Sequence, residues 1–359
     1  MSSQVSNPPR RVLILLLGAI GDVTRGLALA TRIKSAWPET ELIWAVEPKS
    51  AGILERHPAV DRLVVFERPR GFPAYLRFLK ELRSLRCEIT LDLQRHFKSG
   101  VTSLFAGSPK RLGFNRRNAK EGNWLFNNQH IPAVDNWTLK INHYQLFGDV
   151  LGIPALTPLD FGLQPHVDEV ARVDSLLQAE AQRLNMGGLP TGEEFFACIL
   201  GSSWNSRLWP VANWVRAIEV LKEEFRLYPL LVGGPGERAI AAEILQQARG
   251  VVFDLVGKTT LRELVATFSR VAFGVGCDSG PMHICAAVGR PVISLWGSTS
   301  PLRSAPYGNQ HLVLQSPVGC SPCYQRECPG LNTLCMRSLP PEAVLARVTA
   351  GLGVAAGSS

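Results

Sequence analysis

Residues 11–38 read RVLILLLGAIGDVTRGLALATRIKSAWP, and this stretch predicts a strand, a tight turn and a helix. Residues 12–17 form a continuous apolar run, as expected for a strand buried on both faces of a parallel sheet. A glycine-containing turn follows at 18–22. The helical pattern after it continues to about residue 36, where Pro38 ends it because proline cannot continue a helix.

The same alternation continues through both halves of the chain. Apolar runs predict strands at 41–46, 62–66, 89–93 and 111–114, and again at 195–200, 229–233, 252–255, 271–274 and 291–296. Helical patterns separate them, among them 50–56, 74–85, 97–106, 211–224, 237–247, 261–268 and 281–288. Strands that alternate with helices over short loops are typical of parallel sheets with helices on both faces. We therefore expect an α/β protein with two Rossmann-like domains.

The middle of the chain interrupts this pattern. Glycine and proline are frequent at 151–166 and at 185–194, and one helical pattern lies between them. We predict an N-terminal domain over 1–165, an interdomain linker region over 166–194, a C-terminal domain over 195–340 and a terminal helix and tail over 341–359. A length of 359 residues suits two domains.

The positive charge is unevenly distributed. Of the 38 Lys and Arg and the 30 Asp and Glu, residues 1–165 hold 22 and 14, so the remaining residues hold 16 of each. The whole excess of +8 therefore lies in the first half, which has either an ordinary basic surface or an anionic partner such as phospholipid headgroups, a phosphorylated glycolipid or nucleic acid. No nucleic-acid recognition motif is present. The basic amphipathic helix at 74–85 suits either a membrane surface or an ordinary surface.

No apolar stretch is long enough for a membrane span or a signal peptide, so we expect a cytosolic protein.

Four strand-to-helix loops contain residues suited to chemistry. In the first, Asp22 follows the glycine turn and is either a helix N-cap or a general base for a sugar hydroxyl. The loop at 274–283 joins Asp278, Ser279 and Gly280 to a helix start, which predicts an anion site suited to a diphosphate. The alternative there is a capped helix with a buried histidine, His283.

The other two loops lie at 201–210 and 233–237. The first contains small polar residues, Trp204 and Arg207, a composition that suits contacts with phosphate and base. In the second, Glu237 either caps the following helix or bonds a ribose or base.

Taken together, the order of these motifs resembles glycosyltransferase family 9, the ADP-heptose:lipopolysaccharide heptosyltransferases. The resemblance covers about residues 11–350. Besides 11–38, it rests on LDLQRHFKSG at 91–100, SPKRLGF at 108–114, RLWPVANW at 207–214, LVGGPGE at 231–237 and, most specifically, DSGPMHICAAVGRPVISLWG at 278–297.

This resemblance implies a GT-B fold, with two Rossmann-like domains facing a central cleft, and inversion at the anomeric carbon of the transferred sugar. The N-terminal domain would take a lipopolysaccharide inner-core acceptor, Kdo or heptose, and the C-terminal domain would take ADP-heptose. The resemblance also implies a cytoplasmic protein that contacts the inner-membrane surface peripherally, with no cofactor required for catalysis.

The resemblance also implies roles for single residues. Asp22 would be the catalytic base. Arg207 would neutralise the leaving diphosphate, although the family usually has lysine there. The donor-binding residues would be Arg207, Glu237, Asp278, Ser279, Gly280 and His283, and the acceptor-binding residues would be Arg25, Gln94 and Lys98.

Eight cysteines are present, and four of them cluster. Cys320, Cys323, Cys328 and Cys335 could bind a structural zinc or iron ion, remain free thiols or, least suited to the cytosol, form disulfides. The other four lie in apolar contexts and are expected to be buried.

Three alternative functions stay open. The chain could be a family 9 transferase for another acceptor, protein or another glycan, or for another nucleotide sugar. It could also be a non-catalytic nucleotide-binding protein. A nicotinamide oxidoreductase is disfavoured because no G-x-G-x-x-G follows a strand.

Overall fold

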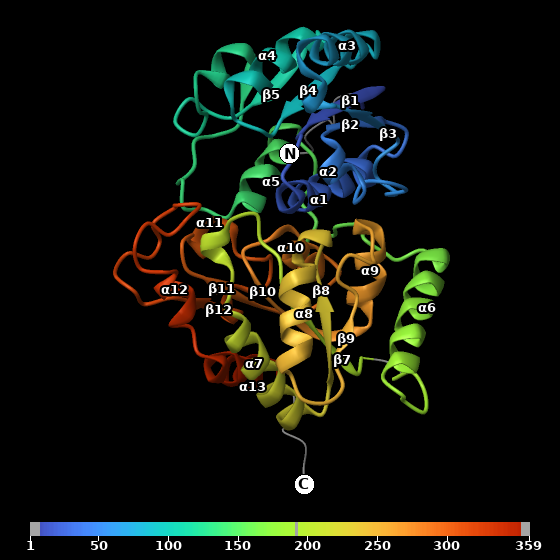
Figure 1. The fold of residues 1–359 in the computed structure, drawn as a ribbon. Helices are drawn as coiled ribbons and strands as arrows, with labels where there is room; N and C mark the ends of the chain where they lie inside the picture. Colours follow the sequence, from blue (N-terminus) through green and yellow to red (C-terminus); the bar gives the residue numbers. More distant parts are fainter. Residues whose placement is uncertain (1–7, 191–192, 353–359) are drawn as a thin grey trace. The chain divides into compact units, whose positions relative to one another are not determined.

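A computed structural model describes residues 8–190 and 193–352 (Figure 1). The chain divides into two compact units, Met1–Leu163 and Gln164–Ser359. The predicted tail beyond residue 352 and the first seven residues lie outside the described ranges. The predicted α/β fold with two Rossmann-like domains is confirmed, because each unit contains its own parallel sheet.

The first unit contains a six-stranded sheet in the order β3-β2-β1-β4-β5-β6, with every neighbouring pair parallel. Its strands are β1 Arg11–Leu15, β2 Glu41–Val46, β3 Arg62–Val65, β4 Ile89–Asp92, β5 Lys110–Gly113 and β6 Gln129–His130. Its helices are α1 Ile20–Ala36, α2 Pro48–Ala51, α3 Gly71–Ser84, α4 Phe97–Ala106 and α5 Lys140–Val150, with short 3-10 turns η1 Arg68–Arg70 and η2 Asn123–Phe126.

Alternation along β1 assigns the helices of this unit to opposite faces. Leu13 and Leu15 point to one face, where they join a buried cluster with Phe78 and Leu82 of α3. Successive strand side chains point to opposite faces. On the other face Gly26 of α1 lies so close to the sheet that an added methyl group would come within 2.9 Å of the Trp44 ring. This close approach fixes the start of α1 next to the end of β1.

The second unit repeats the same topology. Its sheet has the order β12-β11-β10-β7-β8-β9, again with parallel pairs only. Its strands are β7 Phe195–Ile199, β8 Tyr228–Val232, β9 Phe253–Asp254, β10 Val271–Cys277, β11 Val292–Trp296 and β12 Val313–Gln315. Its helices are α6 Val167–Arg183, α7 Val211–Phe225, α8 Arg238–Gln247, α9 Leu261–Ser269, α10 Gly280–Ala287, α11 Pro301–Ser304, α12 Leu334–Arg337 and α13 Pro341–Leu352, with η3 Asn205–Arg207, η4 Pro235–Glu237 and η5 Gln310–Leu312.

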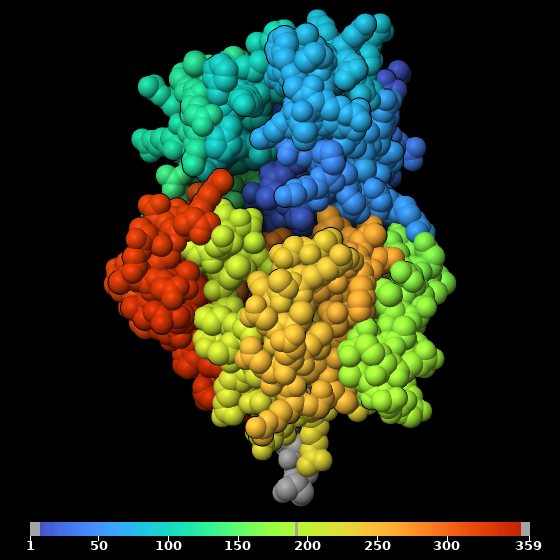
Figure 2. All heavy atoms as spheres, in the orientation of Figure 1, coloured from blue at the N-terminus to red at the C-terminus, as the bar shows by residue number. Residues whose placement is uncertain are grey.

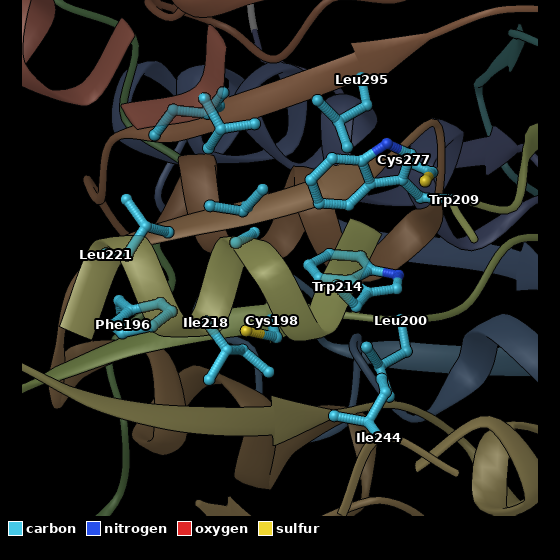
Figure 3. Close-up of a cluster of buried hydrophobic side chains, with 14 of the residues drawn as sticks. Phe196, Cys198, Leu200, Trp209, Trp214, Ile218, Leu221, Ile244, Cys277 and Leu295 are labelled. Carbon is cyan, nitrogen blue, oxygen red and sulfur yellow. The ribbon is translucent and has the colours of Figure 1, made fainter. Parts of the chain in front are cut away.

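A tryptophan pair anchors the core of the second unit. Figure 3 shows Trp209 above Trp214, with Cys277 beside Trp209. The two indole rings pack edge to face with centroids 4.9 Å apart, a favoured aromatic geometry. Trp209 also donates its ring N–H to the Leu339 carbonyl at 3.1 Å. The core therefore holds the segment after β7 and the end of β10 side by side.

The structure differs from the sequence-based expectation at several elements. Helix α5 and strands β6 and β12 were not expected. Helix α6 lies in the range predicted as a linker, but it belongs to the second unit, where it packs on α9 and β9. Its glutamate Glu169 makes a buried ion pair with Arg262 of α9 at 2.9 Å. Within the described ranges, no helix has both the length and the apolar character needed to cross a membrane.

Candidate functional site

In each sheet the chain order of the strands runs in opposite directions from one pair of neighbouring central strands. Several predicted site residues follow the two strands of that pair. In the first unit the reversal lies between β1 and β4, whose ends lead to Asp22 and Gln94. In the second unit it lies between β7 and β10, whose ends lead to Arg207 and Asp278. Open α/β sheets bind ligands beyond the carboxyl ends of the strands at such a point.

The carboxylate of Asp22 is held by two cations. Its Oδ1 accepts from Arg25 at 2.7 Å, and Lys140 of α5 lies 2.9 and 3.2 Å from its two oxygens. The N-cap of α1 is Ala19, without a side-chain capping bond, and Asp22 is the third helical residue. The N-cap alternative for Asp22 is therefore wrong, and its side chain is 22% exposed.

Arg25 is buried, with 6% of its surface exposed, so it is not an ordinary surface residue. Its guanidinium turns inward to Asp22. Lys98, the third predicted acceptor residue, lies exposed in the first turn of α4.

Gln94 supports the loop that leads to Asp22. Its side-chain oxygen accepts the Leu17 N–H at 2.7 Å and its amide donates to the Gly18 carbonyl at 3.3 Å. The Gln94 N–H in turn donates to Asp92 at 3.1 Å. Burial raises the pKa of the Asp92 carboxyl, although hydrogen bonds from Asn123, Ser99 and other neighbours act in the opposite direction.

In the second unit Asp278 is the centre of a hydrogen-bonded group. Its carboxylate lies 3.1 Å from Arg207 and accepts from Thr299 at 3.0 Å, while its carbonyl accepts from Ser202 at 2.8 Å. The Arg207 and Asp278 side chains are each 14% exposed. Arg207 follows β7 and Thr299 follows β11, and both contact the carboxylate of Asp278, which follows β10.

Two buried polar atoms beside this group have no partner. In the described ranges, the Ser279 hydroxyl and the Arg207 Nε make no hydrogen bond. Ser279 is the N-cap of α10, but its side chain forms no capping bond. Since buried polar atoms are normally paired, these two are ready for a ligand. The first turn of α10 directs the N–H groups of Gly280 and Met282 outward from the helix start, which favours an anionic ligand, whereas Pro281 between them has no N–H.

Arg207 stacks on Trp204, with its guanidinium carbon 3.8 Å from the ring centre. Burial lowers the pKa of Arg207, and the Asp278 carboxylate opposes this effect. The residue remains a cation, because arginine titrates far above neutral pH. It therefore offers a fixed, partly desolvated positive charge to an anion.

Glu237 and His283 complete the predicted donor residues. One Glu237 oxygen accepts the Gly234 N–H at 2.7 Å and thereby closes the η4 turn, while α8 begins at the following residue. A methyl group added to Gly201 would come within 2.8 Å of the Glu237 carboxyl carbon, so this carboxylate borders the 201–210 loop. His283 is buried in the first turn of α10.

All eight cysteines are free thiols, so the disulfide alternative is wrong. Burial raises the pKa of Cys198, Cys277 and Cys285, as expected for buried small residues. Within the described ranges, no three side chains of His, Cys, Asp or Glu form a group that could hold a metal ion. The thiols of the 320–335 cluster are therefore not gathered into a ligand set in this structure.

Sequence reasoning missed Lys140 and Thr299. Lys140 begins α5, whose buried residues Ile141, Tyr144 and Phe147 recur at helical spacing and could have revealed the helix. Thr299 follows the last motif quoted above by two residues. Nothing in its local sequence indicates that it bonds Asp278.

Comparisons with known proteins identify the family of the chain. The sequence model of glycosyltransferase family 9 (heptosyltransferase) matches residues 75–333. The lipopolysaccharide core heptosyltransferase OpsX of Haemophilus influenzae is 26% identical over 310 residues, 84% of this chain and 83% of that protein. Lipopolysaccharide heptosyltransferase 1 of Escherichia coli K12 is 25% identical over 321 residues, 86% of this chain and 94% of that protein.

Two solved structures have the same fold. A glycosyltransferase of family 9 from Veillonella parvula has a TM-score of 0.79 at 17% identity, covering 95% of this chain and 96% of that one. E. coli heptosyltransferase WaaC with ADP has a TM-score of 0.74 at 22% identity, covering 95% and 99%.

Two doubly wound units with these strand orders have the GT-B fold, which the two solved structures share. The sequence model of family 9 matches most of the length of this chain. The chain therefore belongs to glycosyltransferase family 9 (heptosyltransferase). It is therefore an enzyme.

Proposed function

We propose that this enzyme transfers heptose from ADP-heptose to a hydroxyl of a lipopolysaccharide inner-core acceptor, Kdo or heptose, with inversion at the anomeric carbon. The names of the relatives support this substrate class, since those compared above are lipopolysaccharide heptosyltransferases. The reaction would take place in the cytoplasm.

In the proposed mechanism Asp22 is the general base. A sugar hydroxyl is a weak nucleophile, and it gains from proton removal as it attacks. Asp22 takes this proton while the acceptor oxygen bonds the anomeric carbon from the face opposite ADP. Arg25 and Lys140 hold the carboxylate in place before the acceptor binds. Arg25, Gln94 and Lys98 stay proposed acceptor-side residues.

The leaving ADP takes the electron pair of the broken bond, so negative charge grows on its diphosphate. Arg207, the Ser279 hydroxyl and the N–H groups at the start of α10 are the proposed partners of that charge. Preorganised donors of this kind lower a barrier because they need no rearrangement during the reaction. Glu237 and His283 are proposed nucleotide-side contacts, and Asp278 orients Arg207.

The observation that carries the donor site is the pair of unpartnered buried atoms, Arg207 Nε and Ser279 Oγ. The test measures ADP release from ADP-heptose, with and without a Kdo–lipid A acceptor, for the wild type and Asp22→Asn. We expect acceptor-dependent release that falls by about 10²–10⁴ in the variant, the usual contribution of a positioned base. ADP binding should be unchanged in the variant, because the substitution lies in the other unit.

Other results of this experiment would support the alternative functions. Tight ADP-heptose binding without release on that acceptor would favour a protein or another glycan as acceptor. Binding without turnover on any acceptor would favour a non-catalytic nucleotide-binding protein. Wild-type protein that binds another nucleotide sugar in place of ADP-heptose would contradict the proposed donor.

We also propose that helix α3 makes the peripheral contact with the anionic inner-membrane surface. Its Phe72 is 68% exposed and Leu76 50% exposed, and they lie one turn apart beside the exposed cations Arg77 and Lys80. Exposed apolar side chains beside cations suit an anionic bilayer. The Phe72→Ser variant should bind vesicles containing anionic lipid more weakly, whereas Leu302→Ser, an equally exposed leucine of the second unit, should not.

A structural zinc or iron at Cys320, Cys323, Cys328 and Cys335 is a separate proposal. It rests on the spacing of the four cysteines alone, because within the described ranges their thiols are not gathered into a ligand set. Elemental analysis of protein purified without chelators tests it, and one metal ion per chain, lost in Cys335→Ser, would support it.

A further inference from the structure

The segment that contains the four clustered cysteines is hydrogen-bonded to the 201–210 loop of the donor site. Ser206 donates its N–H to the Arg326 carbonyl at 3.1 Å and its hydroxyl to the Gln325 carbonyl at 2.6 Å. Asn205 donates to Glu327 at 2.9 Å. In Figure 2 the red segment with residues 320–338 lies beside the yellow-green segment with residues 201–210.

These bonds also connect the segment to the residues that follow β11. The Ser206 hydroxyl lies 2.9 Å from that of Ser298, and the Tyr324 N–H donates to the Ser298 carbonyl at 2.7 Å. Ser298 precedes Thr299, which bonds Asp278. Residues 324–327 are therefore hydrogen-bonded to the residue before Arg207 and to the residue before Thr299, which is the partner of Asp278.

This connection places Arg326 beside Arg207. Both guanidinium groups lie near the Trp204 ring, with carbon-to-centroid distances of 3.8 Å for Arg207 and 5.8 Å for Arg326. Arg207 is balanced by Asp278 at 3.1 Å, whereas Arg326 is exposed. Two cations that share one ring repel each other, so this arrangement favours an anion of more than one charge beside them.

We propose that Arg326 is a second diphosphate-binding residue, and that the cysteine-containing segment is a structural part of the donor site. This inference rests on the proposed ADP-sugar donor. A nucleoside diphosphate carries enough charge to neutralise both guanidinium groups, and arginine binds phosphate oxygens through two parallel N–H bonds. A nucleoside monophosphate has one phosphate group in place of two, so it gains less from a second guanidinium placed beside the first.

The test compares ADP and AMP binding by calorimetry in the wild type, Arg326→Gln, Arg326→Lys and Arg249→Gln. Arg249 is an exposed arginine at the end of α8, at the opposite edge of the sheet, so its substitution removes the same charge elsewhere. We expect the Kd of ADP to rise about tenfold in Arg326→Gln, as for one charge-assisted hydrogen bond. The Kd of AMP should rise much less, and Arg326→Lys should retain part of the ADP affinity.

Salt dependence gives a readout that a purely structural role would not change. The ADP affinity of Arg326→Gln should fall less steeply with ionic strength than that of the wild type, because one charge contact is missing. Equal losses for ADP and AMP, or an effect as large in Arg249→Gln, would overturn the proposal. Wild-type protein that does not bind ADP would instead contradict the proposed donor site, and this role of Arg326 with it.

Discussion

Lys140 and Asp22 lie 118 residues apart in sequence, yet the Lys140 ammonium is 2.9 and 3.2 Å from the two Asp22 carboxylate oxygens. Arg25 holds Oδ1 from within α1 at 2.7 Å. The pairing is possible because α5 packs on α1. Two cations favour the ionised form of a carboxylate, and a general base must be ionised to act.

The first prediction concerns Lys140→Met. Without the ammonium, the Asp22 carboxylate loses one of the two cations that hold it in place. The kcat of acceptor-dependent ADP release should fall about tenfold, as for the loss of one charged hydrogen bond that orients the base. The Kd of ADP should stay unchanged. The measurement is ADP release at saturating acceptor, with ADP binding measured alongside.

Lys34→Met is the matched control for this prediction. Lys34 lies near the other end of α1 and pairs with both oxygens of Asp61 at 2.9 and 2.8 Å. Its loss removes a similar ion pair from the same helix, away from Asp22. A kcat that falls as much in Lys34→Met, or that does not fall in Lys140→Met, would assign Lys140 a structural role only.

The second prediction concerns Arg207. Arg207→Gln should lower the rate of ADP release by about 10²–10³, as found when one preorganised donor to a developing charge is removed. Arg207→Lys should retain part of this rate, since lysine supplies charge without the bidentate geometry. Single-turnover kinetics and ADP binding separate the chemical step from donor affinity.

Arg216→Gln is the control for Arg207. Arg216 is an exposed arginine of α7 and pairs with Glu342 at 3.0 Å, so its loss also breaks an arginine–carboxylate pair. Its rate should equal that of the wild type. If Arg207→Gln changes only thermal stability and leaves the rate intact, Arg207 does not act on the leaving group.

The sequence was sufficient for the features that depend on local pattern. Apolar runs followed by glycine loops placed Asp22, Arg207 and Asp278 between a strand and the next long helix. In the structure each follows β1, β7 or β10, although Asp22 already lies in the first turn of α1. The Asp22 environment could not be predicted in this way, because Lys140 reaches it from a helix 118 residues later. Contacts of this kind depend on how α1 and α5 pack, which no local motif encodes.

The same reason explains the cysteine-containing segment. Its spacing suggested metal binding, but its hydrogen bonds to Ser206 and Ser298 come from backbone carbonyl and N–H groups that carry no sequence signal. The range 166–194 was predicted as a linker because glycine and proline are frequent near it. Helix α6 nevertheless joins the second unit through the buried Glu169–Arg262 pair.

The third prediction is that heptose transfer does not need added Mg²⁺. In the proposed mechanism Arg207 and the N–H groups at the start of α10 neutralise the diphosphate, the role that a metal ion plays in many other transferases. Initial rates without added Mg²⁺ should equal those with it, in protein purified without chelators. A rate that rises on addition of Mg²⁺ would contradict this assignment of Arg207.

The fourth prediction concerns the reactivity of the cysteines. Backbone N–H groups of Gly330, Thr333 and Leu331 hold the pKa of Cys328 below its ordinary value of 9.0. The thiolate is the nucleophile, so at neutral pH Cys328 should react with iodoacetamide faster than an unperturbed exposed thiol. Buried Cys198 and Cys285, whose pKa values burial raises, should react only on unfolding.

Peptide mass spectrometry over a pH series measures this order directly. A lowered pKa means that the thiolate fraction of Cys328 reaches its maximum at lower pH than that of an ordinary cysteine thiol. In protein without bound metal, the alkylation rate of Cys328 should therefore level off at lower pH than that of cysteine in a short reference peptide. If the two rates rise in parallel, the N–H groups of 330–333 do not stabilise the Cys328 thiolate in solution. Cys328→Ser, which removes the fast phase, identifies the site.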